Sequence, residues 1–189
     1  MKSPIEVLLH VARVLDGLNV PYLVGGSVAS SLQGFPRTTN DADIVADIAL
    51  DQVLKIFTAL NDEFYIDDRA IRMAVLESGS FNVIHFDSLF KIDVYIPDKM
   101  FGQQQLRRRR TETLLPDSTQ TTYMSSPEDT ILAKLSWYRK GGEVSQRQLA
   151  DVAGIIKVQG QTLDVPYLRE WADKLNVLDL LEQVLEEIR

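Results

Sequence analysis

The strongest constraint on the fold is a pair of aspartates that opens an apolar strand. Residues 41–46 read DADIVA. Strand alternation puts the carboxylates of Asp41 and Asp43 on one face and the apolar side chains on the other. Two like charges this close repel, and burying them unpaired is costly. A solvated strand end is one way to meet this constraint. A divalent cation is the other, because hard oxygen ligands suit Mg²⁺, which also binds substrate phosphates.

A glycine pair precedes the aspartates. Residues 21–24 form a short apolar strand that runs into Gly25, Gly26 and Ser27, and a short helix is expected over 28–33. Glycines let the backbone approach a ligand closely, and a helix N-terminus offers N–H groups and a positive dipole end to a phosphate. The Ser27 hydroxyl adds a donor. Most Gly-Gly pairs are merely turns, so this pattern gains its meaning from the acids that follow.

A third acid, Asp93, stands between Ile92 and Val94 in the apolar run 90–96. A charged residue in a strand at the middle of a sheet is unusual, because charged side chains are rarely buried without a partner. On an edge strand the same residue would simply face solvent. If this strand lies beside residues 41–46, three carboxylates converge on one edge of the sheet. Two of them can then hold two Mg²⁺ ions, while the third joins them or activates an attacking hydroxyl. Two-metal phosphoryl transfer requires this arrangement.

Strand and helix patterns divide the chain into two parts. The first part mixes helical periodicity with apolar strand runs, and its two runs at 81–86 and 90–96 are expected to pair antiparallel across Asp87-Ser88. The other expected helices are 4–16, 50–60, 69–77 and 98–109, and the other expected strands are 63–67 and 111–115. After Tyr123 the pattern is helical, beginning with a capping serine, a proline and two acids at 126–129. Helices are expected near 127–140, 145–158, 165–174 and 177–188.

The expected fold is therefore an α/β (α+β) domain with a mixed sheet flanked by helices, followed by a C-terminal helical bundle. We place the catalytic domain at residues 1–116 and the helical domain at 117–189. The length of 189 residues is sufficient for such a catalytic domain with a helical appendage.

Composition narrows the class of protein. The chain has no cysteine, which excludes disulfides and thiolate metal sites, and it has no apolar run long enough to cross a bilayer. Its first twenty residues are interrupted by charges and do not resemble a secretory signal, so a cytoplasmic location without membrane contact is expected. A net charge of −7 disfavours a long nucleic-acid partner, because such binding depends on neutralising phosphates.

Taken together, the motifs are far more specific than each alone. The order of motifs resembles that of the DNA polymerase β-like nucleotidyltransferase superfamily. It consists of a strand, Gly-Gly-Ser, a helix, Asp-x-Asp on a strand, and a later aspartate on another strand. More narrowly, GGSVASSLQGFPRTTNDADI is similar to the small bacterial enzymes grouped with the AbiEii-type toxin nucleotidyltransferases. These share Gly-Gly, then Arg-x-Thr, then Asp-x-Asp, and the matching residues here are Gly25, Gly26, Arg37, Thr39, Asp41 and Asp43. SPEDTILAKLSWYRK is similar to the start of that group's helical half, so the resemblance covers nearly the whole chain.

The resemblance implies a role for each matching residue. It implies Mg²⁺ ligation by Asp41 and Asp43, with Asp93 as the third catalytic and metal-binding acid. It implies nucleotide contacts from Gly25, Gly26, Ser27, Arg37, Thr39 and Lys134. The sequence departs from the group before Asp151, where Arg147-Gln148 replaces a basic residue followed by aspartate. That departure weakens a substrate role for Asp151 and leaves the metal site untouched.

Basic residues have alternative explanations. Arg37 either contacts the nucleotide or forms a structural ion pair with Asp41 or Asp43. Both are open because the planar guanidinium group can form two parallel hydrogen bonds to a phosphate or to a carboxylate. Lys134 lies on an expected helix, where lysine usually points to water. The run Arg107–Arg110 is better explained as the solvated C-terminal end of a helix than as a nucleic-acid binding site. Four consecutive residues cannot all lie on one face of a helix, and basic side chains are favourable at a helix C-terminus.

The expected activity is Mg²⁺-dependent transfer of a nucleoside monophosphate from a nucleoside triphosphate to a hydroxyl acceptor, with release of pyrophosphate. The acceptor is a small molecule, a protein or a tRNA end. One alternative is the toxin of a toxin–antitoxin pair, with an antitoxin as partner. Another is a non-catalytic nucleotide-binding or interaction module. The presence of all three acids counts against the module, because a degenerate site has no need to keep repelling charges together.

Overall fold

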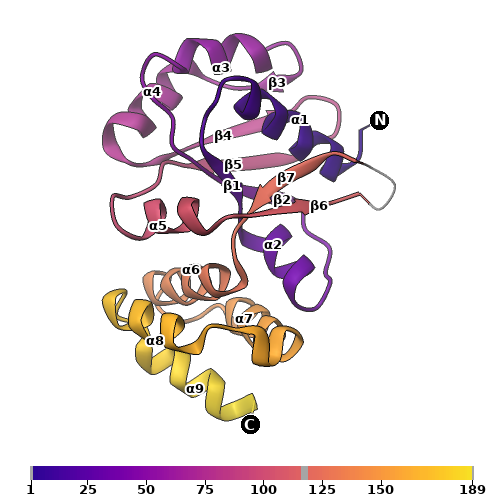
Figure 1. The fold of residues 1–189 in the computed structure, drawn as a ribbon. Coiled ribbons are helices and arrows are strands. Elements are labelled where there is room, and N and C mark those ends of the chain that lie inside the picture. Colours follow the sequence, from indigo (N-terminus) through magenta and orange to yellow (C-terminus); the bar gives the residue numbers. More distant parts are fainter. Residues whose placement is uncertain (1, 116–118, 189) are drawn as a thin grey trace. The chain divides into compact units, whose positions relative to one another are not determined.

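A computed structural model describes residues 2–115 and 119–188 (Figure 1). The chain forms two compact units. The first comprises the N-terminal residues up to Gly25 together with Thr39–Ser125, and the second comprises Gly26–Thr38 together with the residues from Ser126 onward. The chain therefore passes between the units at three peptide bonds, Gly25-Gly26, Thr38-Thr39 and Ser125-Ser126. The boundary predicted between residues 116 and 117 lies outside the described residues.

The first unit is built on a mixed sheet, as the sequence predicts. In the described part of the chain the sheet has seven strands in the order β3-β4-β5-β2-β1-β7-β6. Two neighbouring pairs are parallel, β2 with β5 and β1 with β7, and the other pairs are antiparallel. The strands are β1 (Tyr22–Val24), β2 (Asp41–Ala46), β3 (Phe64–Tyr65), β4 (Ser80–His85), β5 (Lys91–Tyr95), β6 (Arg110–Thr113) and β7 (Thr121–Met124).

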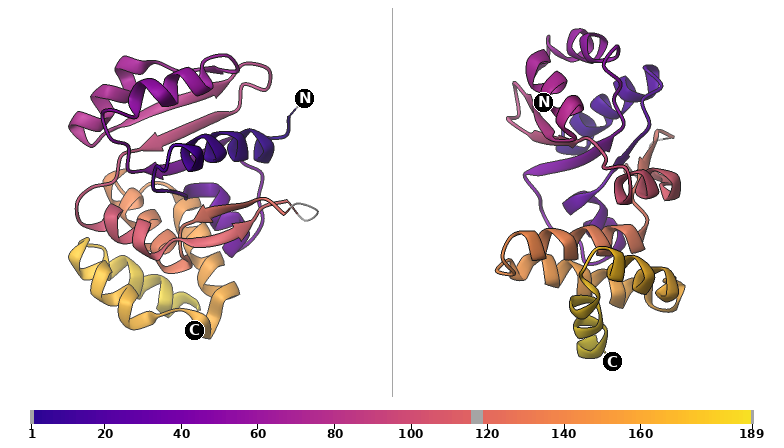
Figure 2. Two further views of the ribbon diagram at one scale, coloured as in Figure 1. Left: turned by 45° about the horizontal axis from the view of Figure 1, so that its top comes forward. Right: turned by 90° about the vertical axis from the view of Figure 1, so that its left-hand side faces the viewer.

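Four helices accompany the sheet in the described residues of this unit: α1 (Pro4–Gly17), α3 (Val53–Leu60), α4 (Asp68–Glu77) and α5 (Phe101–Arg108). A capping box starts α1, in which the Ser3 side chain accepts from the Glu6 backbone and Glu6 accepts from the Ser3 backbone. α1 packs on α3, and α3 lies beside α4, which packs on β4 (Figure 2, left). Burial of apolar side chains between these helices and the sheet forms the core of the unit.

Strand β7 is the main departure from the sequence expectation, which ends the sheet at residue 115. Its residues TTYM carry no clear apolar alternation, because the inward Thr122 is polar. Thr122 is nevertheless 2% exposed, and its hydroxyl lies 3.2 Å from the buried Tyr22 hydroxyl on β1. The Ser125 amide also donates to the Val24 carbonyl at 2.9 Å. Tertiary pairing with β1 therefore makes this strand, which local propensity does not reveal.

The second unit is helical, as predicted. Its elements are α2 (Gly26–Gln33), α6 (Pro127–Lys140), α7 (Gln146–Gln159), the short 3₁₀ turn η1 (Gly160–Thr162), α8 (Val165–Lys174) and α9 (Leu178–Ile188). α2 packs against α6 and α7. The end of α2 approaches the α7 backbone closely. A Cβ atom on Gly34, the residue after α2, would lie 2.9 Å from the backbone nitrogen of Ile155 on α7. None of the helices in the described ranges is long and apolar enough to span a bilayer.

Asp151 on α7 is the centre of a charged network in this unit. One of its oxygens accepts from Lys134 at 2.8 Å, and the carboxylate accepts from Arg37 at 3.1 and 3.0 Å. Ser30 donates to the same carboxylate at 3.2 Å, and Lys134 also donates to Gln148 at 3.3 Å. The network thereby ties the segment around α2 to α6 and α7. Lys134 is only 5% exposed, so it does not point to water as a helical lysine usually does.

The network sets the protonation of Asp151. Burial on its own would raise its pKa, but hydrogen bonds from Arg37 and Lys134 outweigh burial and hold the pKa below the ordinary value of 3.8. A carboxyl with a depressed folded-state pKa stabilises the fold above its unfolded-state pKa. That contribution is lost as pH falls through the folded-state value.

Replacing Asp151 by asparagine is expected to lower the free energy of unfolding by roughly 3 kcal/mol at pH 7, since two cations lose the carboxylate that both contact. The difference between wild type and D151N should shrink as pH falls below 3.8. Urea unfolding across pH measures both effects. Asp173→Asn, which removes an exposed carboxylate from α8, is the matched control. A loss no larger than that of the control would contradict a stabilising role for the network.

Candidate functional site

The structure places the three predicted acids on neighbouring strands. β2 and β5 run parallel and side by side, with Asp43 opposite Asp93 and Asp41 opposite Lys91. Adjacent strands in a sheet lie about 4.8 Å apart, so the paired aspartates begin from neighbouring positions. Asp41 precedes Asp43 by two residues and therefore shares its face. The expected adjacency of the two strands is thus present in the fold.

Alternating burial distinguishes the two faces of these strands. Ala42, Ile44 and Ile92 are fully buried on one face, whereas the acids are half-buried on the other. The apolar positions fix the register, because a shift by one residue would move the carboxylates into the core. The fold therefore keeps the acidic face accessible.

Asp93 is held from two sides. Asn82, its antiparallel partner on β4, donates to Oδ1 through its side-chain amide. The Lys91 Nζ lies 2.7 Å from Oδ2. Both carboxylate oxygens of Asp93 therefore have a nitrogen donor, one from the neighbouring strand and one from its own strand.

Thr39 and Asp41 also contact each other directly. The Thr39 hydroxyl lies 2.9 Å from the Asp41 Oδ1 and 2.9 Å from the Asp41 carbonyl oxygen. Thr39 is predicted to contact nucleotide, and in the structure its hydroxyl orients the Asp41 side chain. The nucleotide contact of Thr39 stays a prediction.

The three carboxylates act together on two neighbouring groups. The hydrogen bond to Asp93 is the main cause of a raised Lys91 pKa, against the effect of burial, and all three aspartate charges raise it further. Burial is the main cause that raises the pKa of Tyr95 to about 12, and the same three charges add to it. Negative potential is therefore concentrated on this face.

The donor set fits a hard divalent cation in chemistry and charge. Carboxylate oxygens are the ligands Mg²⁺ prefers, and the Lys91 ammonium already contacts Asp93 and feels the charge of all three acids. The side chains of residues 2–115 and 119–188 do not include three histidine, cysteine or acidic groups already gathered to hold a metal ion. Mg²⁺ ligation by Asp41, Asp43 and Asp93 therefore stays a prediction.

The glycine motif joins the two units. The Gly25 amide donates to the Asp43 carbonyl at 2.9 Å, which ties the end of β1 to the acidic strand. Gly26 starts α2 with a φ of +54°, a backbone conformation that favours glycine. Ser27 is buried in the first turn of α2. Gly26 and Ser27 belong to the second unit, and their phosphate-binding role stays a prediction.

Arg37 and Lys134 both contact Asp151 in the second unit. For Arg37, the sequence left open a nucleotide contact or a pair with Asp41 or Asp43, and the structure shows an ion pair with a different acid. For Lys134, the structure supplies a structural role that the sequence did not suggest. Nucleotide contacts from these two residues stay predictions.

Sequence analysis missed two residues of the acidic face, Asn82 and Lys91. Each has a sequence signal. Lys91 stands two residues before Asp93 and therefore shares its strand face. A hairpin turning between Asp87 and Ser88 puts Asn82 opposite Asp93.

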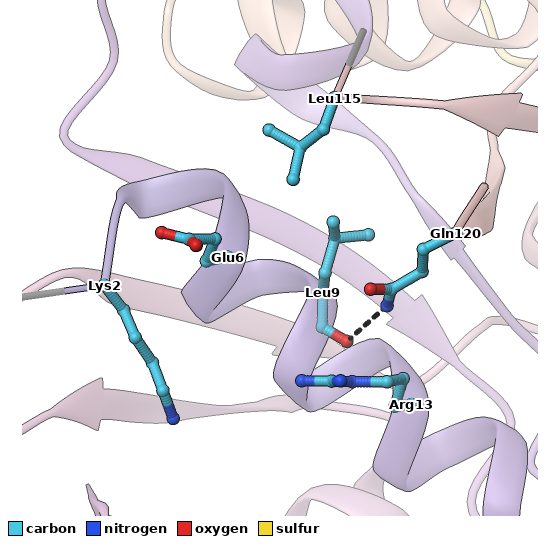
Figure 3. Close-up of a pocket in the computed structure, with 6 residues that line it drawn as sticks. All are labelled: Lys2, Glu6, Leu9, Arg13, Leu115 and Gln120. Atoms are coloured by element: carbon cyan, nitrogen blue, oxygen red, sulfur yellow. Dashed lines mark hydrogen bonds between the residues drawn. The ribbon is translucent and has the colours of Figure 1, made fainter. Parts of the chain in front are cut away.

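A separate hollow of about 210 Å³ lies along α1 in the first unit (Figure 3). The Gln120 side chain crosses to this helix and donates to the Leu9 carbonyl at 3.3 Å. None of the predicted site residues lines this hollow, whose walls are Lys2, Glu6, Leu9, Arg13, Leu115 and Gln120.

The acidic face is expected to cost stability when no metal is bound. Asp43→Asn should raise the free energy of unfolding by roughly 1 kcal/mol in EDTA, since it removes one of three neighbouring like charges. Urea unfolding measures this, with Asp62→Asn in an exposed turn of the same unit as the control. A loss of stability in D43N relative to the control would contradict the expected repulsion.

No protein-family model matches the sequence, and a search of curated proteins finds no significant relative. Solved structures, in contrast, match the fold. The solution structure of the antibiotic-resistance factor ANT(2'')-Ia matches with a TM-score of 0.60 at 12% identity, covering 96% of this chain and 99% of that one. The crystal structure of ANT(2'')-Ia with adenylyl-2''-tobramycin matches with a TM-score of 0.55 at 11% identity, covering 90% and 95%.

An antigenic nucleotidyltransferase-like protein from Paracoccidioides brasiliensis matches with a TM-score of 0.54 at 16% identity, covering 95% of this chain and 90% of that one. These matches extend over nearly the full length of each partner, and they confirm the predicted α/β architecture. They do not single out the AbiEii-type group. The chain has the fold of the nucleotidyltransferases.

Proposed function

We propose that the protein is a nucleotidyltransferase that moves a nucleoside monophosphate from a nucleoside triphosphate to a hydroxyl acceptor. The observation that carries the proposal is the register of β2 and β5, which pairs Asp43 with Asp93 and keeps Asp41 on the same half-buried face. Catalysis of phosphoryl transfer consists mainly of positioning and charge stabilisation, which such a rigid acidic face can provide.

In this proposal Asp41, Asp43 and Asp93 hold the metal, with a two-ion site as the form expected. Mg²⁺, when bound, supplies positive charge that stabilises the attacking and leaving oxygens of an in-line displacement. Thr39 orients Asp41, and Asn82 orients Asp93. Gly25, Gly26 and Ser27 offer backbone and hydroxyl donors to the triphosphate, and Arg37 and Lys134 remain candidate phosphate contacts.

The reaction forms a bond between the acceptor oxygen and the α-phosphorus. The bond from the α-phosphorus to the bridging oxygen breaks, and pyrophosphate leaves with that electron pair. The acceptor hydroxyl loses its proton to a carboxylate of the acidic face. ANT(2'')-Ia is seen with an adenylylated tobramycin, so a hydroxylated small molecule is the first acceptor class to test. A protein and a tRNA end are the next acceptor classes to test. Binding of an antitoxin partner is to be tested after these acceptors.

Mg²⁺-dependent nucleotide binding tests this proposal. Isothermal titration with a panel of non-hydrolysable nucleoside triphosphates should show binding that requires Mg²⁺. Asp43→Asn should weaken the binding at least about tenfold, or about 1.4 kcal/mol, because it removes a metal ligand. The Asp62→Asn protein should bind as the wild type does.

Two results would count against the proposal. Nucleotide binding that is identical with EDTA would show that the metal face is not involved. Absence of binding to every triphosphate, with and without Mg²⁺, would favour the non-catalytic interaction module instead.

A further inference from the structure

We propose that the Lys91 ammonium is a built-in counter-ion of the acidic face, which neutralises Asp93 while Mg²⁺ is absent and leaves it when Mg²⁺ binds. The inference rests on the proposed metal site. It adds a competition between a side chain of this protein and the metal.

The position of Lys91 supports this role. On β5 it precedes Asp93 by two residues and lies on the same face, and across the strand pair it lies opposite Asp41. Its Nζ contacts the Asp93 Oδ2 at 2.7 Å. The ammonium is thus placed beside an oxygen that the metal would take.

The two nitrogen donors on Asp93 differ in how easily they can leave. Asn82 has a short side chain fixed on the neighbouring strand, opposite Asp93. Lys91 has a flexible four-carbon stem, and its side chain is 41% exposed against 15% for Asp93. The lysine head can therefore swing to water without moving the strand, while Asn82 continues to orient the carboxylate.

Charge decides the direction of the effect. In the absence of metal, one ammonium partly offsets three carboxylates, which lowers the repulsion on this face. A divalent cation neutralises the same carboxylates more strongly, but it must first displace the ammonium or bind beside it. Lys91 should therefore stabilise the metal-free fold and weaken the binding of free Mg²⁺.

This competition would also link metal loading to the nucleotide. Mg²⁺ that arrives with a triphosphate brings phosphate oxygens as additional ligands, and the released ammonium gains a new anionic neighbour. Free Mg²⁺ has neither advantage. Lys91 would thus favour loading of the metal together with the nucleotide.

The test compares Lys91→Met with Lys91→Arg, which keeps the charge, and with Lys55→Met, which removes an exposed lysine from α3. Free Mg²⁺ affinity is measured by isothermal titration without nucleotide, and thermal stability is measured in EDTA. K91M should bind Mg²⁺ roughly five- to tenfold more tightly than wild type and melt at a lower temperature in EDTA. K91R keeps the charge and should not gain Mg²⁺ affinity, whereas K55M should behave as the wild type does.

The outcomes separate this inference from the proposed function. Equal or weaker Mg²⁺ affinity in K91M, with measurable binding in wild type, would overturn the counter-ion role and leave the metal site intact. Absence of Mg²⁺ binding in both proteins would overturn the metal site, and the inference with it. Lys91→Gln provides the same comparison should K91M fail to fold.

Discussion

The parallel pairing of β2 with β5 is the interaction on which the candidate site depends. The apolar sides of β2 and β5 bury against the core and fix the register, and the same register brings the three acids to one face. Like charges on one face repel each other, and here Lys91 and Asn82 contact Asp93 while Thr39 contacts Asp41. The use that we propose for this arrangement is to hold a cation, since local strain is found most often at functional sites.

The stretch from Gly25 to Asp43 is divided between the two compact units. Gly25 ends the strand beside Asp43, and Gly26 begins a helix that packs with the C-terminal helices. The Asp151 network holds the returning segment through Arg37, two residues before Thr39. One continuous stretch of sequence therefore carries both the acidic strand and part of the helical unit. ANT(2'')-Ia, at 12% identity, matches the fold over 96% of this chain.

The features that depend on local periodicity could be predicted from the sequence. Alternation put Asp41 and Asp43 on one face, and the apolar surroundings of Asp93 marked its strand as one that lies within the sheet. Apart from the pairing of residues 41–46 with the strand of Asp93, features that arise from distant contacts were not predicted. The pairing of Arg37 with Asp151 joins residues far apart in sequence, and β7 forms because Thr122 finds Tyr22 on another strand. The position of Asn82 could have been derived from the predicted hairpin, because the turn sets the register.

The central claim is that the acids of β2 and β5 form one metal site. Crystals grown with Mn²⁺ and a non-hydrolysable triphosphate would test it directly, because manganese is located by its anomalous scattering. We expect a manganese peak in direct contact with oxygens from Asp41, Asp43 and Asp93, with the Lys91 ammonium turned away. A bound triphosphate without manganese at these carboxylates, or manganese held only elsewhere, would contradict it.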